Sequence, residues 1–242
     1  MARRRVAALA AAVSVALAGS AFAGCSTDDP DTGSTQTAAG DSGATGKGNA
    51  SATKDAPQQD DWYTKSFGSF AATRKSGTSD SVVGLPKGAK AGIVKATYRG
   101  SSNFVIQALD SSNQPTVDLL VNTIGNYAGT TAYGLSDLGE AAKLKVTAKG
   151  AWTLVISPIA NAKTLPESGK GDGVYRFDGS ATTWKITNKG EGNFVVNQVS
   201  DDLIPNLAVN EIGNYKGDVP ASSGPSVVTV TSDGVWTIRG GS

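Results

Sequence analysis

Acidic side chains are the main candidates for catalytic chemistry in this chain, because its 242 residues include no histidine and a single cysteine. These absences exclude a histidine general base, an intramolecular disulfide and a thiolate zinc cluster. A hydrolase working through carboxylates alone needs two acids at a set distance across a cleft. The acids to consider, most of which lie in turn-like stretches, are Asp110, Asp118, Asp137, Glu140, Glu167, Asp172, Asp178, Glu191, Asp201, Asp202, Glu211 and Asp233. We therefore expect a non-enzymatic protein with no cofactor and no metal, and a carboxylate-based hydrolase is the less favoured alternative.

Aromatic side chains are the main candidates for ligand binding, because a flat ring offers a large apolar face on which a sugar can stack. We select Trp62, Tyr63 and Trp184, which have no counterpart in the internal repeat described below. A fold must be specified in both copies of a repeat, whereas a site need occur only once. Core packing is the alternative for Trp184. An added edge strand is the alternative for Trp62 and Tyr63.

The N-terminus has the order of regions found in a secretory signal. Arg3, Arg4 and Arg5 are followed by an apolar run over 6–18 and then by small residues. The run is shorter than the roughly 20 residues that a bilayer-spanning helix needs. We therefore expect residues 1–24 to be a signal peptide.

The end of this signal, Phe22-Ala23-Gly24-Cys25, resembles the bacterial lipoprotein box. The resemblance implies that Cys25 is lipidated, becomes the new N-terminus and anchors the protein to the outer face of the cytoplasmic membrane. Phe22 departs from the usual leucine. Cleavage after Ala23, which would yield a secreted protein with a free thiol, is the alternative.

Residues 25–61 form the predicted tether. Segment 26–61 contains seven Asp and two Lys among Ser, Thr, Gly and Ala, with almost nothing apolar. Such a segment cannot bury enough surface to offset the entropy of ordering. We expect a disordered spacer between the membrane and the folded part.

The rest of the chain contains two copies of one unit. The first copy matches the second in order and spacing, and the separation between matching residues falls from 92 to 84 along the chain. The matching segments are Asn103-Phe104-Val105 with Asn193-Phe194-Val195, 119–129 with 207–217, and Gly150-Ala151-Trp152 with Gly234-Val235-Trp236. Because the length differences fall between these segments, we place them in loops.

Each copy reads as short strands separated by turn residues, which is typical of an antiparallel sandwich or jelly roll. The predicted fold is all-β, with a first unit over 62–160 and a second over 167–242. A single sandwich built jointly from both copies is the alternative. The predicted strands are 81–85, 93–98, 103–109, 117–124, 143–148 and 151–156, then 173–178, 182–187, 193–199, 206–212, 226–231 and 235–239.

The repeat resembles units found in secreted or membrane-anchored proteins of high-GC Gram-positive bacteria. Those units combine an Asn-Phe strand, a Val-Asn-x-Ile-Gly-x-Tyr segment and a closing Gly-x-Trp-x-Ile strand. The resemblance covers both copies. It implies an envelope location and a β fold, and it implies no activity.

Residues that recur in both copies are expected to serve the fold. Trp152 and Trp236 alternate with aliphatic residues and should point into the core. Tyr127 and Tyr215 each follow Gly-Asn and should pack at a corner beside a glycine with positive φ. Two recurring acids next to strand starts, Asp80 and Asp172, should accept backbone hydrogen bonds.

The overall charge is close to neutral, with 22 basic and 21 acidic residues, and a nucleic-acid partner would normally require a basic excess. We predict a binding or interaction module displayed outside the cytoplasmic membrane, with a cell-wall glycan or a surface protein as its partner. A structural spacer of the envelope is the alternative.

Overall fold

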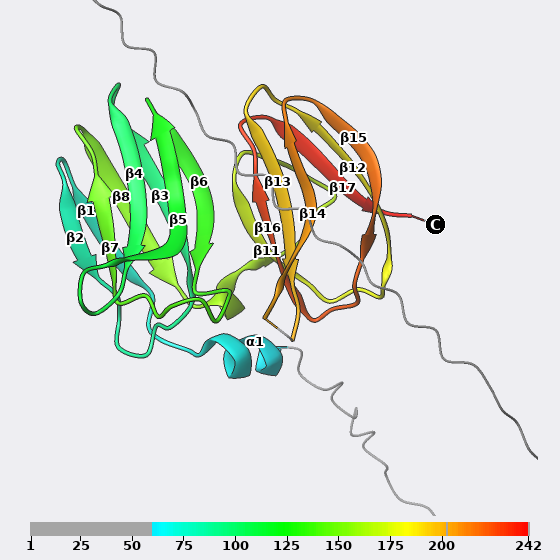
Figure 1. The fold of residues 1–242 in the computed structure, drawn as a ribbon, viewed down its shortest axis with the longest axis horizontal. Coiled ribbons are helices and arrows are strands. Elements are labelled where there is room, and N and C mark those ends of the chain that lie inside the picture. The colour runs from blue at the N-terminus through cyan, green and yellow to red at the C-terminus, as the bar shows by residue number, and fades with distance from the viewer. Residues whose placement is uncertain (1–59, 202, 242) are drawn as a thin grey trace, which may run out of the picture. The chain divides into compact units, whose positions relative to one another are not determined.

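The computed structural model describes residues 60–201 and 203–241, which are nearly all β-structure (Figure 1). The predicted signal peptide, Cys25 and the tether up to residue 59 lie outside the described residues. The elements are α1 (Asp60–Phe67), β1 (Thr73–Gly77), β2 (Ser81–Gly84), β3 (Gly92–Arg99), β4 (Asn103–Leu109), β5 (Pro115–Ile124), β6 (Tyr127–Tyr133), β7 (Lys143–Thr147), β8 (Ala151–Ser157), the 3-10 helix η1 (Ile159–Asn161), β9 (Lys163–Thr164), β10 (Ser168–Lys170), β11 (Gly173–Phe177), β12 (Thr182–Lys189), β13 (Asn193–Val199), β14 (Pro205–Ile212), β15 (Tyr215–Ala221), β16 (Ser226–Thr231) and β17 (Val235–Gly240).

The first unit is a sandwich of two four-stranded antiparallel sheets, with strand orders β1-β8-β3-β6 and β2-β7-β4-β5 (Figure 1). Consecutive strands lie in opposite sheets, except β4 and β5, which pair within one sheet, and this is the strand order of a jelly roll. Strands β6 and β5 are the last strands of their sheets. Each therefore has one edge with no strand beside it in its own sheet.

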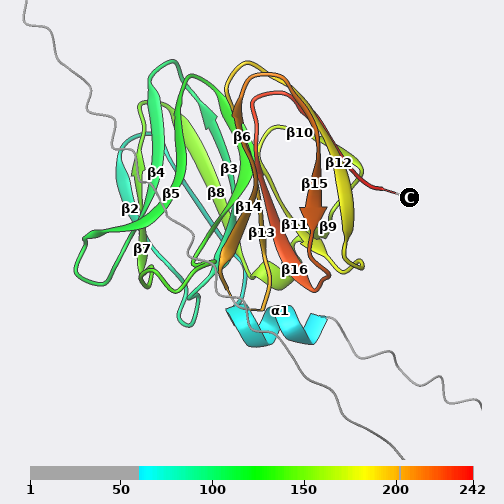
Figure 2. The ribbon, with the colours of Figure 1, turned by 45° about the vertical axis from the view of Figure 1, so that its right-hand side comes forward.

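The second unit repeats this topology strand for strand. Its sheets have the orders β10-β17-β12-β15 and β14-β13-β16-β11, and β9 extends the second sheet by pairing in parallel with β11 (Figure 2). Even the irregularities recur, because the β4–β5 and β13–β14 ladders both shift register in mid-strand. The predicted fold class of tandem antiparallel jelly-roll-like units is confirmed.

Sequence reasoning missed strands β1, β6, β9, β10 and β15. Strand β1 is Thr-Arg-Lys-Ser-Gly and has no apolar residue, and β15 contains a glycine and a proline. These strands are recruited by pairing with stronger neighbours, since β1 pairs along its whole length with β8. Tertiary pairing thus supplied what local propensity did not indicate.

Each unit encloses its own apolar core between its two sheets. In β8 the residues alternate between the core and the outside, with Trp152, Leu154 and Ile156 buried, and Trp236 and Ile238 do the same in β17. The two cores are separate clusters. The period of two predicted from the sequence is therefore present in the closing strand of both copies.

A third apolar cluster joins the two units and the helix. It combines Tyr63 and Phe67 of α1 with Ile93 of β3 in the first unit and with Val174 and Val227 in the second. The helix thus packs against residues of both copies. All these residues belong to one compact unit of the chain, 53–242.

The expectation that Trp62 and Tyr63 form an added edge strand is wrong, because they lie in the first turns of α1. Their rings pack edge to face at 4.9 Å, and Trp62 also meets Phe67 at 5.5 Å. Tyr63 and Phe67 are four residues apart and so lie on one face of the helix, and the Trp62 ring contacts both of them. Gly68, at φ +79°, donates to the carbonyl of Thr64 at 2.8 Å and ends the helix.

Candidate functional site

The three aromatic residues selected as ligand-binding candidates lie in different places. Trp184 is 1% exposed and packs edge to face on Phe177 at 5.2 Å inside the second core. Tyr63 is fully buried, and Trp62 is half-buried beside it. The rings of Trp184 and Tyr63 therefore have no face free for a ligand, so the selection of these two as ligand-binding residues is wrong and the core alternative for Trp184 is correct. Trp184 shares the buried face of β12 with Ile186, as the alternation of that strand indicates, and Tyr63 is buried where α1 packs on both units.

Tyr63 has a structural role that its burial explains. Its hydroxyl donates to the Asp178 carboxylate at 2.9 Å and to the Ser226 carbonyl at 3.1 Å, and the Arg176 guanidinium lies 5.4 Å from its ring centroid. Burial and the neighbouring Asp178 raise the pKa of the Tyr63 phenol well above its ordinary value. The residue ties α1 to the second unit.

The recurring tryptophans occupy the cores, as expected. Trp152 and Trp236 each lie opposite a glycine of the neighbouring strand, Gly77 and Gly169. A Cβ atom at Gly169 would lie 2.2 Å from the Trp236 ring, and one at Gly77 would lie 2.5 Å from the Trp152 ring. Glycine is thus required at both positions by the tryptophan ring that covers it.

The recurring tyrosine of the first unit makes a contact that the sequence did not reveal. Tyr127 follows Gly125, at φ +88°, and its hydroxyl donates to the Asp172 carboxylate of the second unit at 2.7 Å. Thr130 donates its backbone N–H to the backbone carbonyl of Asp172 at 3.1 Å. Burial and the Asp172 charge raise the pKa of Tyr127. Strand β6 of the first unit is therefore bonded to the start of β11 in the second.

Asp172 also has the backbone role predicted for it. Its other carboxylate oxygen accepts the N–H of Ser232 at 2.9 Å, and Asp80 accepts the N–H of Ala148 at 2.8 Å in the first unit. Both recurring acids thus fasten the turn by which the chain crosses from one sheet to the other, between β7 and β8 in the first unit and between β16 and β17 in the second. The prediction of backbone capping is confirmed for both.

Two neighbouring cavities form a groove between the units, alongside the bonded strands. The larger encloses about 920 Å³ and the smaller about 220 Å³. Both are lined by Leu119, Leu120 and Thr231, so they adjoin one another. Five consecutive residues of β5, 119–123, line the larger one. We call this pair of cavities the inter-unit groove.

The walls of the inter-unit groove carry neutral hydrogen-bonding side chains. Carboxamides and hydroxyls dominate, and the charged groups are one lysine and three acids. The polar side chains are Asn122, Thr123, Asn126, Tyr127, Asn193, Lys170, Asp172, Ser232 and Asp233 in the larger cavity, and Asp118, Thr130, Thr131, Ser136, Asn197 and Thr229 in the smaller one, with Thr231 in both. Within the described residues, the buried hydroxyl of Thr131 has no hydrogen-bond partner.

The acids of the groove are held by backbone groups. Asp233 accepts the N–H groups of Glu191 and Gly192, the latter at 2.8 Å, and Asp118 accepts the N–H of Gly134 at 2.8 Å. Burial raises the pKa of Asp118, and this hydrogen bond opposes the shift. These bonds give each carboxylate a local structural function.

No group of three or more possible metal-ligating acids or cysteines occurs within 60–201 and 203–241. The stretch from Asp110 to Gln114 forms a turn in which the Asp110 carboxylate accepts the N–H of Gln114 at 2.8 Å, so turn chemistry accounts for its oxygen-rich sequence. In the same part of the chain, no helix has the length and apolar character of a membrane span.

Sequence reasoning missed the groove, although a signal for it exists in the comparison of the two copies. The outer face of the sheet containing β2 and β7 carries Lys143 and Lys145, whereas the matching positions in β16 are Val227 and Thr229. Loss of charge on one face of one copy marks the face that the other copy covers. The similarities between the two copies identify the strands, and the differences between them locate the contact between the units.

The chain is thus a tandem pair of jelly rolls with a polar groove between them. No family model and no curated protein sequence matches it. Among solved structures, the regulatory subunit of a cAMP-independent protein kinase A from Trypanosoma cruzi, bound to guanosine, matches at a TM-score of 0.21. The two chains share 12% identity over 70% of this chain and 72% of that one. A score this low supports no argument about fold or function.

Proposed function

We propose that this chain is a non-catalytic, lipid-anchored protein of the bacterial cell envelope whose inter-unit groove binds a neutral segment of a cell-wall glycan. The observation that carries the proposal is the composition of the groove, in which carboxamide and hydroxyl side chains from both units face one space. Such groups both donate and accept hydrogen bonds, which suits the hydroxyl groups of a sugar.

The size of the groove agrees with a short oligosaccharide segment. Its larger cavity, about 920 Å³, lies at the upper end of the roughly 300–1,000 Å³ typical of small-molecule sites. The groove runs along β5, the last strand of its sheet. The unpartnered hydroxyl of Thr131 in the smaller cavity would gain a partner from a bound sugar.

The contacts that join the two units hold the groove walls in place, and this favours a preformed binding site over an active site that is closed by a moving lid. Tyr127, Asp172 and the cluster around Tyr63 and Val174 join the two units on one side of the groove. A site held in its binding geometry loses less entropy when its ligand arrives. The predicted anchor at Cys25 and the predicted tether would present this site to the wall.

A structural spacer is the second candidate, and a specific observation favours it. The side chains of Trp152, Trp184 and Trp236 are all at most 4% exposed, so the described part offers few exposed aromatic rings for sugar stacking. A spacer would depend on the joined units as a stiff element. It would bind no soluble or insoluble glycan.

Co-sedimentation with purified cell wall and insoluble polysaccharides distinguishes these candidates. The protein is the exported full chain carrying Cys25→Ser, so that no lipid contributes to sedimentation. Asn193→Ala and Asn122→Ala each remove an exposed carboxamide from the groove. Asn210→Ala is the matched control, because Asn210 occupies the position of Asn122 in the second copy and is also exposed.

If the groove binds a glycan, the parent chain and the control should sediment with the polymer. Each groove variant should bind it with an affinity about tenfold lower. Retention that the groove variants leave unchanged would place the site elsewhere. Failure of the parent chain to sediment with any polymer would exclude the glycan proposal and leave the spacer.

A further inference from the structure

The two copies present the same tyrosine hydroxyl in the same way, but only one of the two has a partner within the chain. The Tyr127 ring lies 5.8 Å from Phe104 at 44°, and the Tyr215 ring lies 5.7 Å from Phe194 at 42°. Each hydroxyl lies over the glycine two residues later. Tyr127 donates to Asp172, whereas no donor bond from Tyr215 occurs within the described residues.

The acceptor also occurs twice. Asp80 holds the N–H of Ala148 as Asp172 holds that of Ser232, so the two carboxylates have the same orientation. Asp80 is exposed and lines an open cavity of about 350 Å³ with residues that include Lys149. Its second oxygen receives no hydrogen bond from the described part of the chain. Of the two tyrosines and two aspartates of this repeated motif, the Tyr215 hydroxyl and one Asp80 oxygen thus have no partner within the described residues, and they lie on opposite copies.

We propose that the Tyr215 hydroxyl of one molecule donates to the Asp80 carboxylate of another, so that the edge of β15 at Tyr215 docks on a second copy of this chain. The contact would reproduce the one that already joins β6 to β11 inside the chain. Because donor and acceptor surfaces differ, the association is heterologous and forms an open head-to-tail series. The inference is independent of the glycan proposal.

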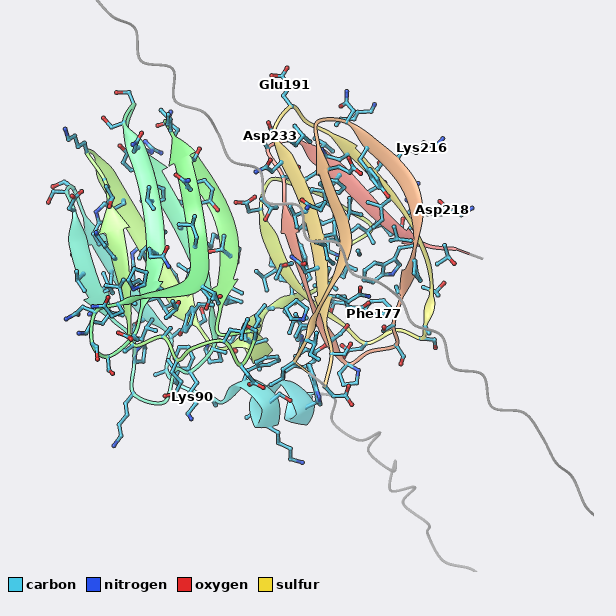
Figure 3. The ribbon with its side chains drawn as sticks, in the orientation of Figure 1. Lys90, Phe177, Glu191, Lys216, Asp218 and Asp233 are labelled. Atoms are coloured by element: carbon cyan, nitrogen blue, oxygen red, sulfur yellow. The ribbon has the colours of Figure 1, made fainter. Side chains whose placement is uncertain are left out.

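The edge of β15 is free to dock. Among the described residues it is the last strand of its sheet, as β6 is of the corresponding sheet, so no described strand lies beside its outer backbone groups. Figure 3 shows the side chains of Lys216 and Asp218 extending outward from this strand, and both are exposed. The matching residues of β6 are Ala128 and Thr130.

The edge of β15 and the surface around Asp80 carry complementary charges if they meet in the same way as the edge of β6 and the start of β11 meet inside the chain. There, Ala128 lies beside Gly171 and Asp172, and Thr130 shares the smaller cavity with Thr229. Thr123 likewise shares the larger cavity with Asp233.

Replacing each residue by its counterpart in the other copy produces three opposite-charge pairs. Lys216 meets Asp80, Asp218 meets Lys145, and Glu211 meets Lys149. The neutral or singly charged pairs inside the chain thus become ion pairs between molecules. This correspondence favours a second copy over an unrelated partner.

The apolar cluster that supports the contact inside the chain has no equivalent in the contact between molecules, so the association between molecules is the weaker of the two. Val227 and Ile93 of the shared cluster correspond to Lys143 and Thr183, and α1 contributes to the internal contact only. The contact between molecules is therefore polar, weak and sensitive to salt. It should form only at high protein concentration.

Sedimentation velocity of the exported full chain carrying Cys25→Ser tests the proposal, from about 1 µM to about 1 mM. We expect the weight-average sedimentation coefficient to rise with concentration beyond that of a dimer, and to fall when salt is added. Tyr215→Phe removes only the hydroxyl, and Asp80→Asn keeps the oxygen that accepts the Ala148 N–H. Each should weaken association about tenfold.

Mixing the two variants gives a result that only a head-to-tail contact produces. Tyr215→Phe retains an intact Asp80 surface and Asp80→Asn retains an intact Tyr215 edge, so an equal mixture should form dimers that stop at two. Asp218→Lys and Lys145→Glu should each weaken association, and the doubly substituted chain should recover it. Lys75→Glu, on the exposed strand β1, is the control for Lys145→Glu.

A chain that stays monomeric up to about 1 mM would overturn the proposal. So would association that Tyr215→Phe and Asp80→Asn leave unchanged, or a mixture of the two variants that associates no better than either alone.

Discussion

Replacing Gly169 by alanine should destabilise the second unit, because the position opposite Trp236 has no room for a methyl group. An added Cβ would lie 2.2 Å, 2.6 Å and 2.7 Å from three ring atoms of Trp236. Carbon atoms in contact prefer a separation of about 3.5–4.0 Å, so the ring would have to move by more than about 1 Å. Trp236 is fully buried, and its indole N–H donates to the Gly171 carbonyl at 3.0 Å.

Overpacking of this kind costs about 1–3 kcal/mol, and the rigid, tethered ring places Gly169→Ala near the upper end. For a protein of this size each kcal/mol lowers Tm by about 2–4 °C, so we expect a decrease of roughly 4–12 °C. Urea unfolding followed by circular dichroism gives the change in free energy directly.

Gly240→Ala is the matched control, since Gly240 lies in β17 of the same unit and nothing lies within 4 Å of a Cβ added there. It should change stability by at most about 0.5 kcal/mol. Equal stabilities for Gly169→Ala and Gly240→Ala would refute the explanation that the Trp236 ring requires glycine at position 169. A double-mutant cycle with Trp236→Leu should recover part of the Gly169→Ala loss, because a smaller side chain leaves space for the methyl group.

Three further predictions concern the contact between the units, a buried acid and the anchor. Tyr127→Phe leaves Asp172 without its 2.7 Å donor and should cost about 1–3 kcal/mol in the free energy of unfolding; the measurement is urea unfolding, and an unchanged midpoint would contradict the role of this bond. Burial raises the pKa of Asp118, so the folded state loses stability as pH rises through that pKa. Asp118→Asn should therefore raise Tm at pH 7 and have little effect at pH 3, where the parent side chain is protonated in both states; a gain independent of pH would exclude ionisation as the cause. Cys25→Ser should release the protein from the membrane fraction, and retention of the variant there would disprove the lipid anchor.

Much of the fold could be predicted because the repeat supplied two independent readings of the same strands. Where apolar and polar residues alternate, as in Trp152, Leu154 and Ile156, the pattern identified the strand and its buried face. Where a strand is polar throughout, as in β1, or contains glycine and proline, as in β15, the sequence has no such pattern. Those strands exist because a neighbouring strand offers them hydrogen bonds.

The candidate site was beyond reach of the same reasoning, because it belongs to neither copy alone. Asn122 and Asn193 are 71 positions apart in the sequence and come together only when β6 lies beside β11. The residues selected for being unique instead turned inward, since Trp184 fills the second core and Tyr63 joins α1 to it. Trp184 and Tyr63 are absent from the first copy and the second copy, respectively, because the two copies pack differently, and not because these residues form an exposed face.

The sequence by itself determined that the chain holds two copies of an all-β unit, that Trp152 and Trp236 lie in cores, and that Asp80 and Asp172 cap backbone groups. These features follow from short-range patterns of polarity and turn chemistry, which act along a single strand or loop. Only the tertiary structure decided that Tyr127 bonds to the other copy, that α1 packs on both copies, and that a polar groove lies between them. Such contacts depend on the docking of whole sheets, and the free energy of docking is spread over residues that local patterns do not connect.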